Sequence, residues 1–79
     1  MTRYRVFDTI AHYNDNDIYD YYVYFKGHVS PLSLGETSGY QPQLKDDVLE
    51  IIDEDAGILI GVFDYADILA ITATPLFID

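Results

Sequence analysis

The absence of cysteine constrains this fold more than any other feature, because the chain is only 79 residues long. A domain of this size buries only about 60% of the surface that its unfolded chain exposes. Many small domains compensate with disulfide bonds or thiolate-bound metals, and a chain without cysteine can use neither. Side-chain packing alone must hold this fold together. Apolar side chains are plentiful, since 49% of the residues are hydrophobic, which predicts a folded core and not a disordered acidic tail.

The chain is expected to form a single domain over residues 1–79, because it has no internal repeat, no low-complexity tract and no long linker. Its N-terminus, MTRYRVFDT, lacks the apolar core of a secretory signal peptide. The best candidate for a membrane span is interrupted by Asp64 and Asp67 and falls short of about 18 apolar residues. The expected location is the cytoplasm.

The N-terminal part of the chain predicts a β-hairpin. Residues 3–13, RYRVFDTIAHY, alternate loosely and are rich in β-branched and aromatic types, which favours a strand. Ile18–Val29, IYDYYVYFKGHV, has the same character. The loop between them is NDND, made of turn-forming Asn and Asp, so the two segments are expected to pair.

The middle of the chain leaves two interpretations open. Residues 30–43, SPLSLGETSGYQPQ, hold two prolines and two glycines, which predicts a flexible loop. Over 44–55 the apolar residues fall at helical spacing, which favours a short helix. The stripe consists of Leu44, Val48, Ile51 and Ile52. The sequence VLEII, followed by EDAG and ILIGVF, also fits a β-hairpin.

Two apolar runs complete the chain. Ile58–Phe63 and Ile68–Ile78 are nearly continuous in apolar and β-branched residues, as in strands that lie in the middle of a sheet or are shielded on both faces. Pro75 indicates that the last strand lies at a sheet edge or has a bulge. The predicted fold class is mainly β, a small antiparallel sheet with one short helix at 44–55 if the helical stripe prevails. The alternative class is α+β.

The charge balance excludes several classes of partner. Fourteen acids against four bases give a net charge of −10, which opposes direct binding to DNA, RNA or an anionic membrane. A positively charged partner is favoured instead. The alternative is that acidity keeps a tyrosine-rich β protein soluble. Clustering argues against that alternative, because DDVLEIIDED at Asp46–Asp55 holds six carboxylates and no Lys or Arg follows it.

Crowded carboxylates destabilise a small domain. Alternate residues of a strand lie about 6.6 Å apart, and two unit charges at about that distance in water repel by roughly 0.6 kcal/mol. A cationic partner would relieve this repulsion. Because DNA presents its phosphates as lines of negative charge, a rigid protein with lines of carboxylates could occupy a basic DNA-binding groove. The candidate partner-binding residues are Asp15, Asp17, Asp20, Asp46, Asp47, Glu50, Asp53, Glu54, Asp55, Asp64 and Asp67.

Catalytic and metal-binding patterns are not specific in this sequence. His12 and His28 could act as general bases, but neither neighbours a nucleophile in sequence, and there is no glycine-rich phosphate loop. The acidic pairs at Asp15–Asp17 and Asp53–Asp55 offer oxygen ligands, yet neither fits a calcium-binding loop. The sixth position counted from Asp15 is Asp20, where glycine is needed. We therefore expect no enzymatic activity, no metal and no cofactor.

Tyrosines crowd the second predicted strand. Tyr19, Tyr21, Tyr22 and Tyr24 could form a stacking platform for single-stranded nucleic acid, but such platforms need a basic surround. The alternative is that they pack a sheet or anchor a protein interface, where tyrosine is enriched. An acidic interaction module or assembly subunit that binds through this tyrosine-rich β face is therefore the second functional hypothesis.

In size, composition, lack of cysteine and carboxylate clustering, the chain resembles the small acidic DNA-mimic proteins that phages make to disable host DNA-binding proteins. The resemblance covers the whole chain in composition and transfers no individual residue. It implies an inhibitor that occupies the basic DNA-binding surface of a bacterial protein, most plausibly a nucleoid-associated one, in the host cytoplasm. A homodimer built through the tyrosine-rich or C-terminal apolar strands would double the length of the acidic track.

Overall fold

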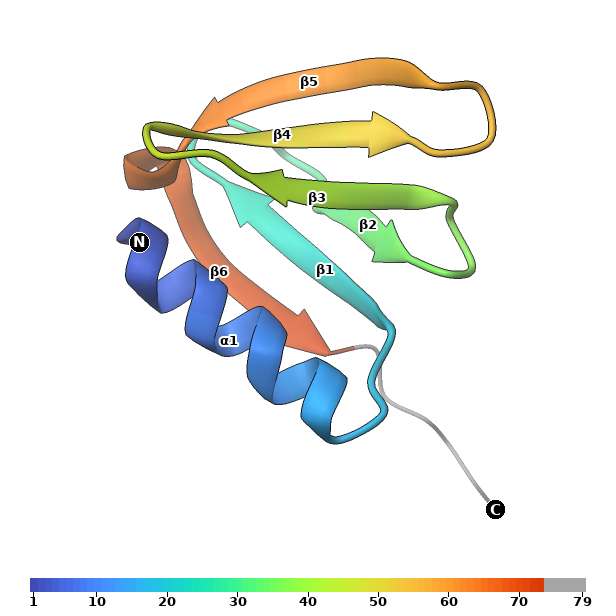
Figure 1. The fold of residues 1–79 in the computed structure, drawn as a ribbon. Coiled ribbons are helices and arrows are strands. Elements are labelled where there is room, and N and C mark those ends of the chain that lie inside the picture. Colours follow the sequence, from blue (N-terminus) through green and yellow to red (C-terminus); the bar gives the residue numbers. More distant parts are fainter. Residues whose placement is uncertain (74–79) are drawn as a thin grey trace.

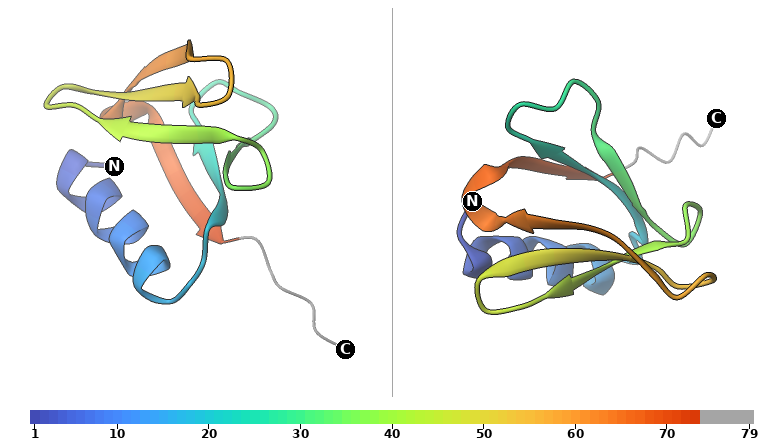
Figure 2. Two further views of the ribbon diagram at one scale, coloured as in Figure 1. Left: turned by 45° about the vertical axis from the view of Figure 1, so that its right-hand side comes forward. Right: turned by 90° about the horizontal axis from the view of Figure 1, so that it is seen from above.

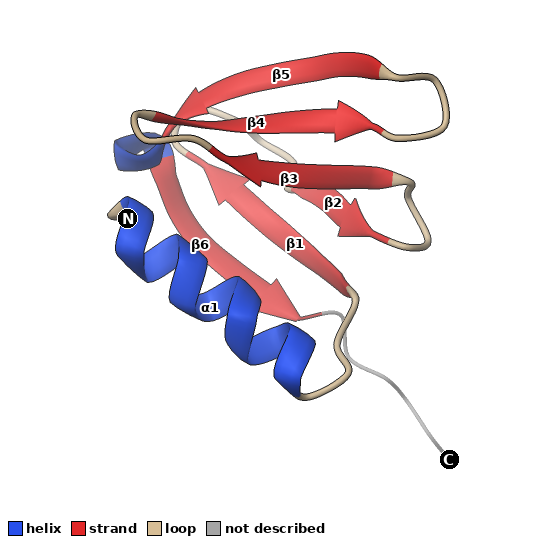
Figure 3. Ribbon diagram, in the orientation of Figure 1, coloured by secondary structure: helices blue, strands red, loops and turns tan. Residues whose placement is uncertain are grey.

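A computed structural model of the chain describes residues 1–73. Strands make up most of the described secondary structure, with one long helix and one short 3-10 helix (Figure 3). The expectation of a mainly β fold with antiparallel sheets and a helix is confirmed, although the helix is not at 44–55. The elements are α1 (Arg3–Asp15), β1 (Asp20–Phe25), β2 (Leu32–Gly35), β3 (Tyr40–Leu44), β4 (Val48–Asp53), β5 (Ile58–Asp64), the 3-10 helix η1 (Tyr65–Asp67) and β6 (Ile68–Ala73).

The strands form two antiparallel sheets of three strands each. The first has the order β2-β1-β6 and the second the order β3-β4-β5. In Figure 1 the second sheet lies above the first, and α1 runs beside β6. The two further views in Figure 2 show that α1 lies beneath the second sheet. Within residues 1–73 no helix is long and apolar enough to cross a membrane.

The core lies between the helix and the two sheets, and it draws on both sheets, the helix and η1. No polar or charged residue in the described part of the chain is buried. Apolar packing therefore fills the space between the layers, and hydrogen bonds such as that from the Tyr13 hydroxyl to the Ile71 carbonyl at 2.9 Å also join them. The buried residues are Val6, Ile10, Tyr21, Val23, Phe25, Leu34, Leu49, Ile51, Tyr65, Ile68 and Ile71.

The strand predicted over residues 3–13 is wrong, since this segment forms α1. Its hairpin with Ile18–Val29 therefore does not exist. Thr2 caps the helix by accepting a hydrogen bond from the Arg5 N–H at 3.1 Å. Val6 and Ile10, four residues apart, lie on one face and are buried against the sheets. Tertiary burial of this face outweighs the strand propensity of the β-branched and aromatic residues.

The predicted strand Ile18–Val29 is confirmed in a shorter form as β1, whereas the flexible loop predicted at 30–43 is wrong. That segment holds β2, most of β3 and the turn that links the two sheets. Pro42 is tolerated in β3 because this strand lies at a sheet edge, where a missing N–H breaks no inner ladder. Composition alone therefore misled the assignment.

The helix favoured at 44–55 is also wrong, and the alternative hairpin interpretation is confirmed as β4 and β5. Leu49 and Ile51 are buried, while Val48, Glu50 and Ile52 are only partly buried. This alternation has the period of a strand. The helical spacing was a coincidence of apolar residues that in fact lie on both faces of β4.

The two C-terminal strands are confirmed as strands but not as shielded ones. β5 lies at the edge of its sheet, and Ile58, Leu59, Ile60 and Val62 are between 42% and 56% exposed. The described part of the last predicted strand is β6, which also lies at a sheet edge within residues 1–73. The interpretation of Pro75 falls outside the described residues.

Gly35 allows β2 to approach β1 closely. Its φ of +122° is rarely adopted by residues with a side chain, and a Cβ built on it would collide with the backbone carbonyl of Tyr19. The next residue, Glu36, donates its N–H to the same Tyr19 carbonyl at 3.2 Å. Gly35 therefore sets the position of Glu36 relative to β1.

Replacing Gly35 with alanine should cost about 3 kcal/mol or more of unfolding free energy, because backbone strain and a backbone clash add together. Gly57→Ala is the matched control, since Gly57 also has a positive φ, +67°, but nothing lies near its missing Cβ. That control should cost only about 1 kcal/mol. Urea unfolding followed by circular dichroism measures both values, and equal losses would contradict the proposed clash.

Candidate functional site

Seven of the fourteen Asp and Glu residues lie at one end of the molecule. The C-terminus of α1 with the loop to β1, the β2–β3 turn and the β4–β5 turn all lie at the right-hand end of Figure 1. Antiparallel hairpins place these turns together, because alternate connections of a meander fall at the same end. We call this surface the acidic end. Its carboxylates are Asp15, Asp17, Asp20, Glu36, Asp53, Glu54 and Asp55.

Hydrogen bonds fix the β2–β3 turn against β1. The Asp20 carboxylate accepts the Thr37 N–H at 2.8 Å and the Thr37 hydroxyl at 2.9 Å. The Tyr19 carbonyl accepts the Glu36 N–H at 3.2 Å. Two carboxylates from segments 16 residues apart in sequence, Asp20 and Glu36, are thereby held on one rigid frame.

The β4–β5 turn is anchored to the same frame. Glu54 donates its N–H to the Gly39 carbonyl at 3.2 Å. Within the turn, the Asp53 carboxylate accepts the N–H groups of Asp55 at 3.0 Å and Ala56 at 3.2 Å, an arrangement typical of Asx turns. These bonds order the backbone that carries three of the seven carboxylates, so the acidic end is a built surface and not a set of independent side chains.

No Lys or Arg lies at the acidic end, and all four of these residues are described. Arg5 lies in the first half of α1, and Arg3, Lys26 and Lys45 lie at the opposite end. Arg3 donates through Nε to the Lys45 carbonyl at 3.2 Å and lies 4.0 Å from the Asp46 carboxylate. We call this opposite surface the mixed end, since its acids are accompanied by these three bases. Those acids are Asp46, Asp47, Asp64 and Asp67.

The structure therefore divides the eleven predicted partner-binding residues. Six of them lie at the acidic end, four lie at the mixed end, and Glu50 lies in the middle of β4 opposite Gln43 and Val62. The dense cluster at Asp46–Asp55 is split between both ends, because β4 runs the length of the molecule. Carboxylates that are close in sequence are therefore not all close in space.

Sequence reasoning missed Glu36, which belongs to the acidic end. It stood alone in the segment predicted to be a flexible loop. Only the pairing of Gly35 with Asp20 brings it next to the other carboxylates. No pattern within its own segment could have indicated this, since the relevant neighbours are remote in sequence.

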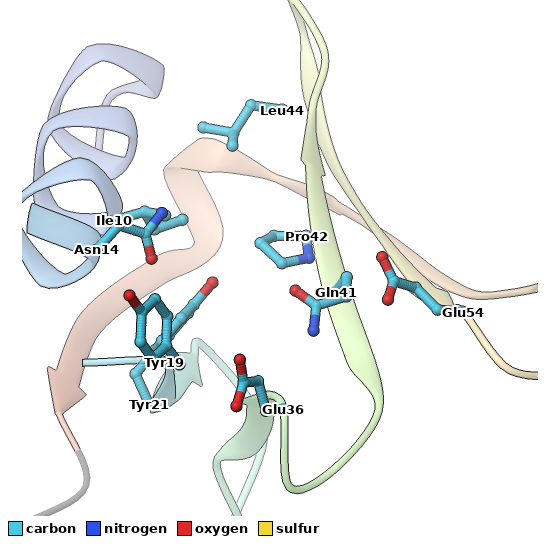
Figure 4. A pocket seen from close by; sticks show the side chains of 9 residues that line it. All are labelled: Ile10, Asn14, Tyr19, Tyr21, Glu36, Gln41, Pro42, Leu44 and Glu54. Carbon is cyan, nitrogen blue, oxygen red and sulfur yellow. The ribbon is translucent and has the colours of Figure 1, made fainter. Parts of the chain in front are cut away.

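A cleft of about 400 Å³ opens at the acidic end between α1, β1 and β3 (Figure 4). Polar groups on its rim include the carboxylates of Glu36 and Glu54, and apolar side chains such as Ile10 and Leu44 form part of its wall. The cleft is therefore a hollow with a negative rim and a partly apolar interior. Its lining residues are Ile10, Asn14, Tyr19, Tyr21, Glu36, Gln41, Pro42, Leu44 and Glu54.

Tyr19 reports the negative potential at the rim. Its hydroxyl donates to the Asp17 carboxylate at 3.0 Å. This hydrogen bond and the nearby negative charge of Asp17, with a smaller contribution from Glu36, raise the pKa of the Tyr19 phenol. A phenolate at this position would be repelled by its surroundings, whereas a cation would be attracted.

Tyr21 lies deeper, and its side chain is only 3% exposed. Burial raises the pKa of Tyr21 to about 12. No hydrogen bond of its hydroxyl is found within residues 1–73, yet no fully enclosed side-chain N or O atom there lacks a partner. Tyr21 is also one of the residues that line the cleft.

The four predicted interface tyrosines do not share one exposed face. Tyr21 belongs to the core, whereas Tyr22 is half-buried and Tyr19 and Tyr24 are exposed. The alternation along β1 explains this division, because successive side chains of a strand point to opposite faces. An outward face of the first sheet thus carries Tyr22 and Tyr24 only.

The two histidines lie apart from each other and from the cleft. His12 borders a shallow hollow on α1 with Arg5 and Asp8. His28 packs near Phe25, with ring centroids 5.9 Å apart. Within residues 1–73 no group of three or more His, Asp or Glu side chains is arranged to hold a metal ion.

The comparisons with known proteins add no relative to this description. No protein-family model, no curated protein and no solved structure matches the chain. The functional argument therefore rests on the charge, shape and chemistry of the two ends and the cleft.

Raising the pH should destabilise the protein through Tyr21. Because its pKa rises on folding from 10.0 to about 12, the neutral phenol favours the folded state, and this contribution is full below pH 10. It should fall by about 2 to 3 kcal/mol between pH 10 and pH 12, since the unfolded state ionises first. Urea unfolding at several pH values measures the loss. Tyr21→Phe should lose correspondingly less over this range, and identical losses in both proteins would contradict the assignment.

Proposed function

We propose that this protein is a non-enzymatic inhibitor that occupies the basic DNA-binding surface of a bacterial DNA-binding protein, most plausibly a nucleoid-associated one. The single observation that carries the proposal is the acidic end, where seven carboxylates lie in or directly beside three connections with no Lys or Arg among them. A protein surface that binds DNA phosphates would meet negative charges of the same kind at the acidic end.

The separation of charge into two ends supports this proposal over simple acidity for solubility. Solubility needs only net charge, which dispersed acids supply equally well. In this chain three bases accompany the acids of one end while the other end has none. This uneven charge distribution orients the molecule in the electric field of a basic partner, so that the acidic end approaches the partner first.

The ordered backbone of the acidic end also supports mimicry. A partner that grips phosphates meets charges at fixed spacing on a stiff duplex. The bonds of Asp20 to Thr37 and of Glu54 to Gly39 hold two turns in place before any partner arrives. Preorganised charges bind better than mobile ones, because less conformational entropy is lost on association.

Reversing charge at the acidic end should abolish inhibition. Asp15→Lys with Asp55→Lys changes the local charge by four units, and neither side chain has a hydrogen bond among residues 1–73. The protein should be used to capture a basic partner from bacterial lysate, and the captured partner should then be bound to a labelled DNA duplex. Wild-type protein should displace the duplex, and the double variant should need at least tenfold more protein, measured by fluorescence anisotropy at physiological salt.

The matched control reverses two exposed acids at the mixed end, Asp47→Lys with Asp64→Lys, which changes the charge by the same amount. It should weaken displacement less than threefold. Equal weakening by both double variants would show that only net charge matters, and failure of the wild-type protein to displace DNA would refute mimicry. Circular dichroism should show that both variants remain folded.

We further propose that two copies pair through β5. This strand lies at a sheet edge, and no charged residue occurs from Ile58 to Phe63. Copies that each carry a charge of −10 can meet favourably only at an uncharged surface. β5 runs from the acidic end to the mixed end, so antiparallel pairing would set each acidic end beside the mixed end of its partner. The two acidic ends would then lie at opposite ends of the dimer.

Ile60→Lys should convert the dimer to a monomer, because a lysine on an edge strand opposes strand pairing. Lysine also lowers the net negative charge, so general repulsion could not explain the loss. Leu69→Lys, at an exposed apolar position on β6, should leave the dimer intact. Sedimentation equilibrium distinguishes the species, and a monomeric wild-type protein would contradict the pairing.

The alternative function, binding through the tyrosine face, depends on Tyr22 and Tyr24 of β1. Their outward positions beside Ser33, Thr72 and Ala70 leave room for a partner. If this face makes the contact, capture of the partner should persist at high salt and should fail when both tyrosines are replaced by serine. Capture by mimicry should instead be lost as salt rises.

A further inference from the structure

We propose that the cleft at the acidic end accepts an arginine side chain of the basic partner. This inference rests on the proposed function, since it names the contact by which the partner would be held. The cleft is lined by nine residues from α1, the α1–β1 loop, β1, β3 and two turns, and most of them carry no charge. The cleft would supply geometric specificity to an attraction that the acidic end exerts at longer range.

Two carboxylates at the rim of the cleft can accept hydrogen bonds from a ligand. Glu36 and Glu54 enter from different turns, and no side-chain hydrogen bond or ion pair involves either of them within residues 1–73. Both belong to the lining of the cleft, and Figure 4 draws them on opposite sides of β3. A guanidinium group has five N–H donors in a planar fork, so it can serve acceptors on more than one side.

Tyr21 provides an independent observation that points to a ligand. The residue is only 3% exposed and lines the cleft, and no hydrogen bond of its hydroxyl is found within residues 1–73. Leaving a nearly buried polar group unpaired costs free energy. A bound guanidinium would give the phenol oxygen a donor.

The walls fit the rest of an arginine side chain. Ile10, Pro42 and Leu44 line the cleft and can cover the methylene groups. The ring of Tyr19 lies in the same lining, where an aromatic face and a nearby negative charge both favour a cation. Asn14 and Gln41 add amide oxygens as further acceptors.

Arginine fits this set better than lysine does. The acceptors are spread over both turns, the helix and β3, which suits a planar group with several donors. A lysine ammonium is a compact charge with three donors and stronger hydration, so it would satisfy fewer of them at once. The proposal therefore predicts selectivity and not only attraction of positive charge.

Nuclear magnetic resonance titration of the free protein tests the site directly. The probe is Nα-acetyl-arginine amide, with the lysine analogue and the neutral citrulline analogue as comparisons. The arginine probe should shift the backbone amide signals of Tyr21, Glu36, Gln41 and Glu54. The lysine probe should bind at least threefold more weakly, and the citrulline probe should not saturate. Equal binding of all three probes would overturn the proposal.

Variants locate the binding. Glu36→Gln with Glu54→Gln should weaken the arginine probe at least tenfold, and Tyr21→Phe should weaken it severalfold while the fold persists. Asp46→Asn with Asp47→Asn removes the same charge at the mixed end and should change binding less than twofold. Equal loss in this control would show that the cleft is not the site. Since a free polyamine carries related cationic groups, spermidine is titrated as well, and binding of spermidine without binding of the arginine probe would overturn the assignment to arginine.

The outcome is separable from that of the proposed function. The titration contains neither DNA nor a DNA-binding protein, so arginine binding can stand even if DNA displacement fails. Conversely, Asp15→Lys with Asp55→Lys leaves all nine lining residues of the cleft unchanged. If DNA displacement succeeds while the cleft ignores arginine, mimicry stands and this inference falls.

Discussion

Apolar packing between α1 and the two sheets is the interaction on which everything else in this protein depends. The chain has no cysteine and buries no polar or charged side chain within residues 1–73. Burial of Val6 and Ile10 therefore holds the helix in the core, together with the hydrogen bond from the Tyr13 hydroxyl to the Ile71 carbonyl. That packing has to outweigh the repulsion among seven carboxylates at one end. The acidic end is built from turns and from the terminal residues of α1, β1 and β4, so its charges lie outside the core.

The sequence predicted those parts of the fold that local residue patterns determine. β1 follows from a loose alternation of β-branched and aromatic residues, and β5 and the start of the last strand follow from nearly continuous apolar runs. α1 was missed because Val6 and Ile10 are β-branched, and only their burial against remote strands makes the helix favourable. β2 and β3 were missed because Gly35 and Pro42 are typical loop residues whose positions here, a close strand approach and a sheet edge, are set by tertiary contacts.

The sequence predicted that the candidate site would be acidic, but it did not predict which carboxylates lie together. Composition revealed that charge would dominate the surface, and it named six of the seven carboxylates at the acidic end. It also joined Asp46 and Asp47 to Asp53 and Asp55, although β4 carries these pairs to opposite ends. Glu36 was missed for the converse reason, since register alone brings it to Asp20. In this fold, the turn in which a carboxylate lies decides which other charges are near it. Its distance from them along the chain does not.

Tyr21 links the stability of the fold to the chemistry of the cleft. Phenylalanine would fill the same space in the core without the cost of a nearly buried hydroxyl. A tyrosine is favoured there where its oxygen meets something polar, and water or a ligand in the cleft that Tyr21 lines can supply this. Because Glu36 and Glu54 stand at the rim, the polar group favoured at that oxygen is a cation that donates hydrogen bonds. One residue thus belongs to the packing that sustains the acidic end and to the hollow where that end would hold its partner.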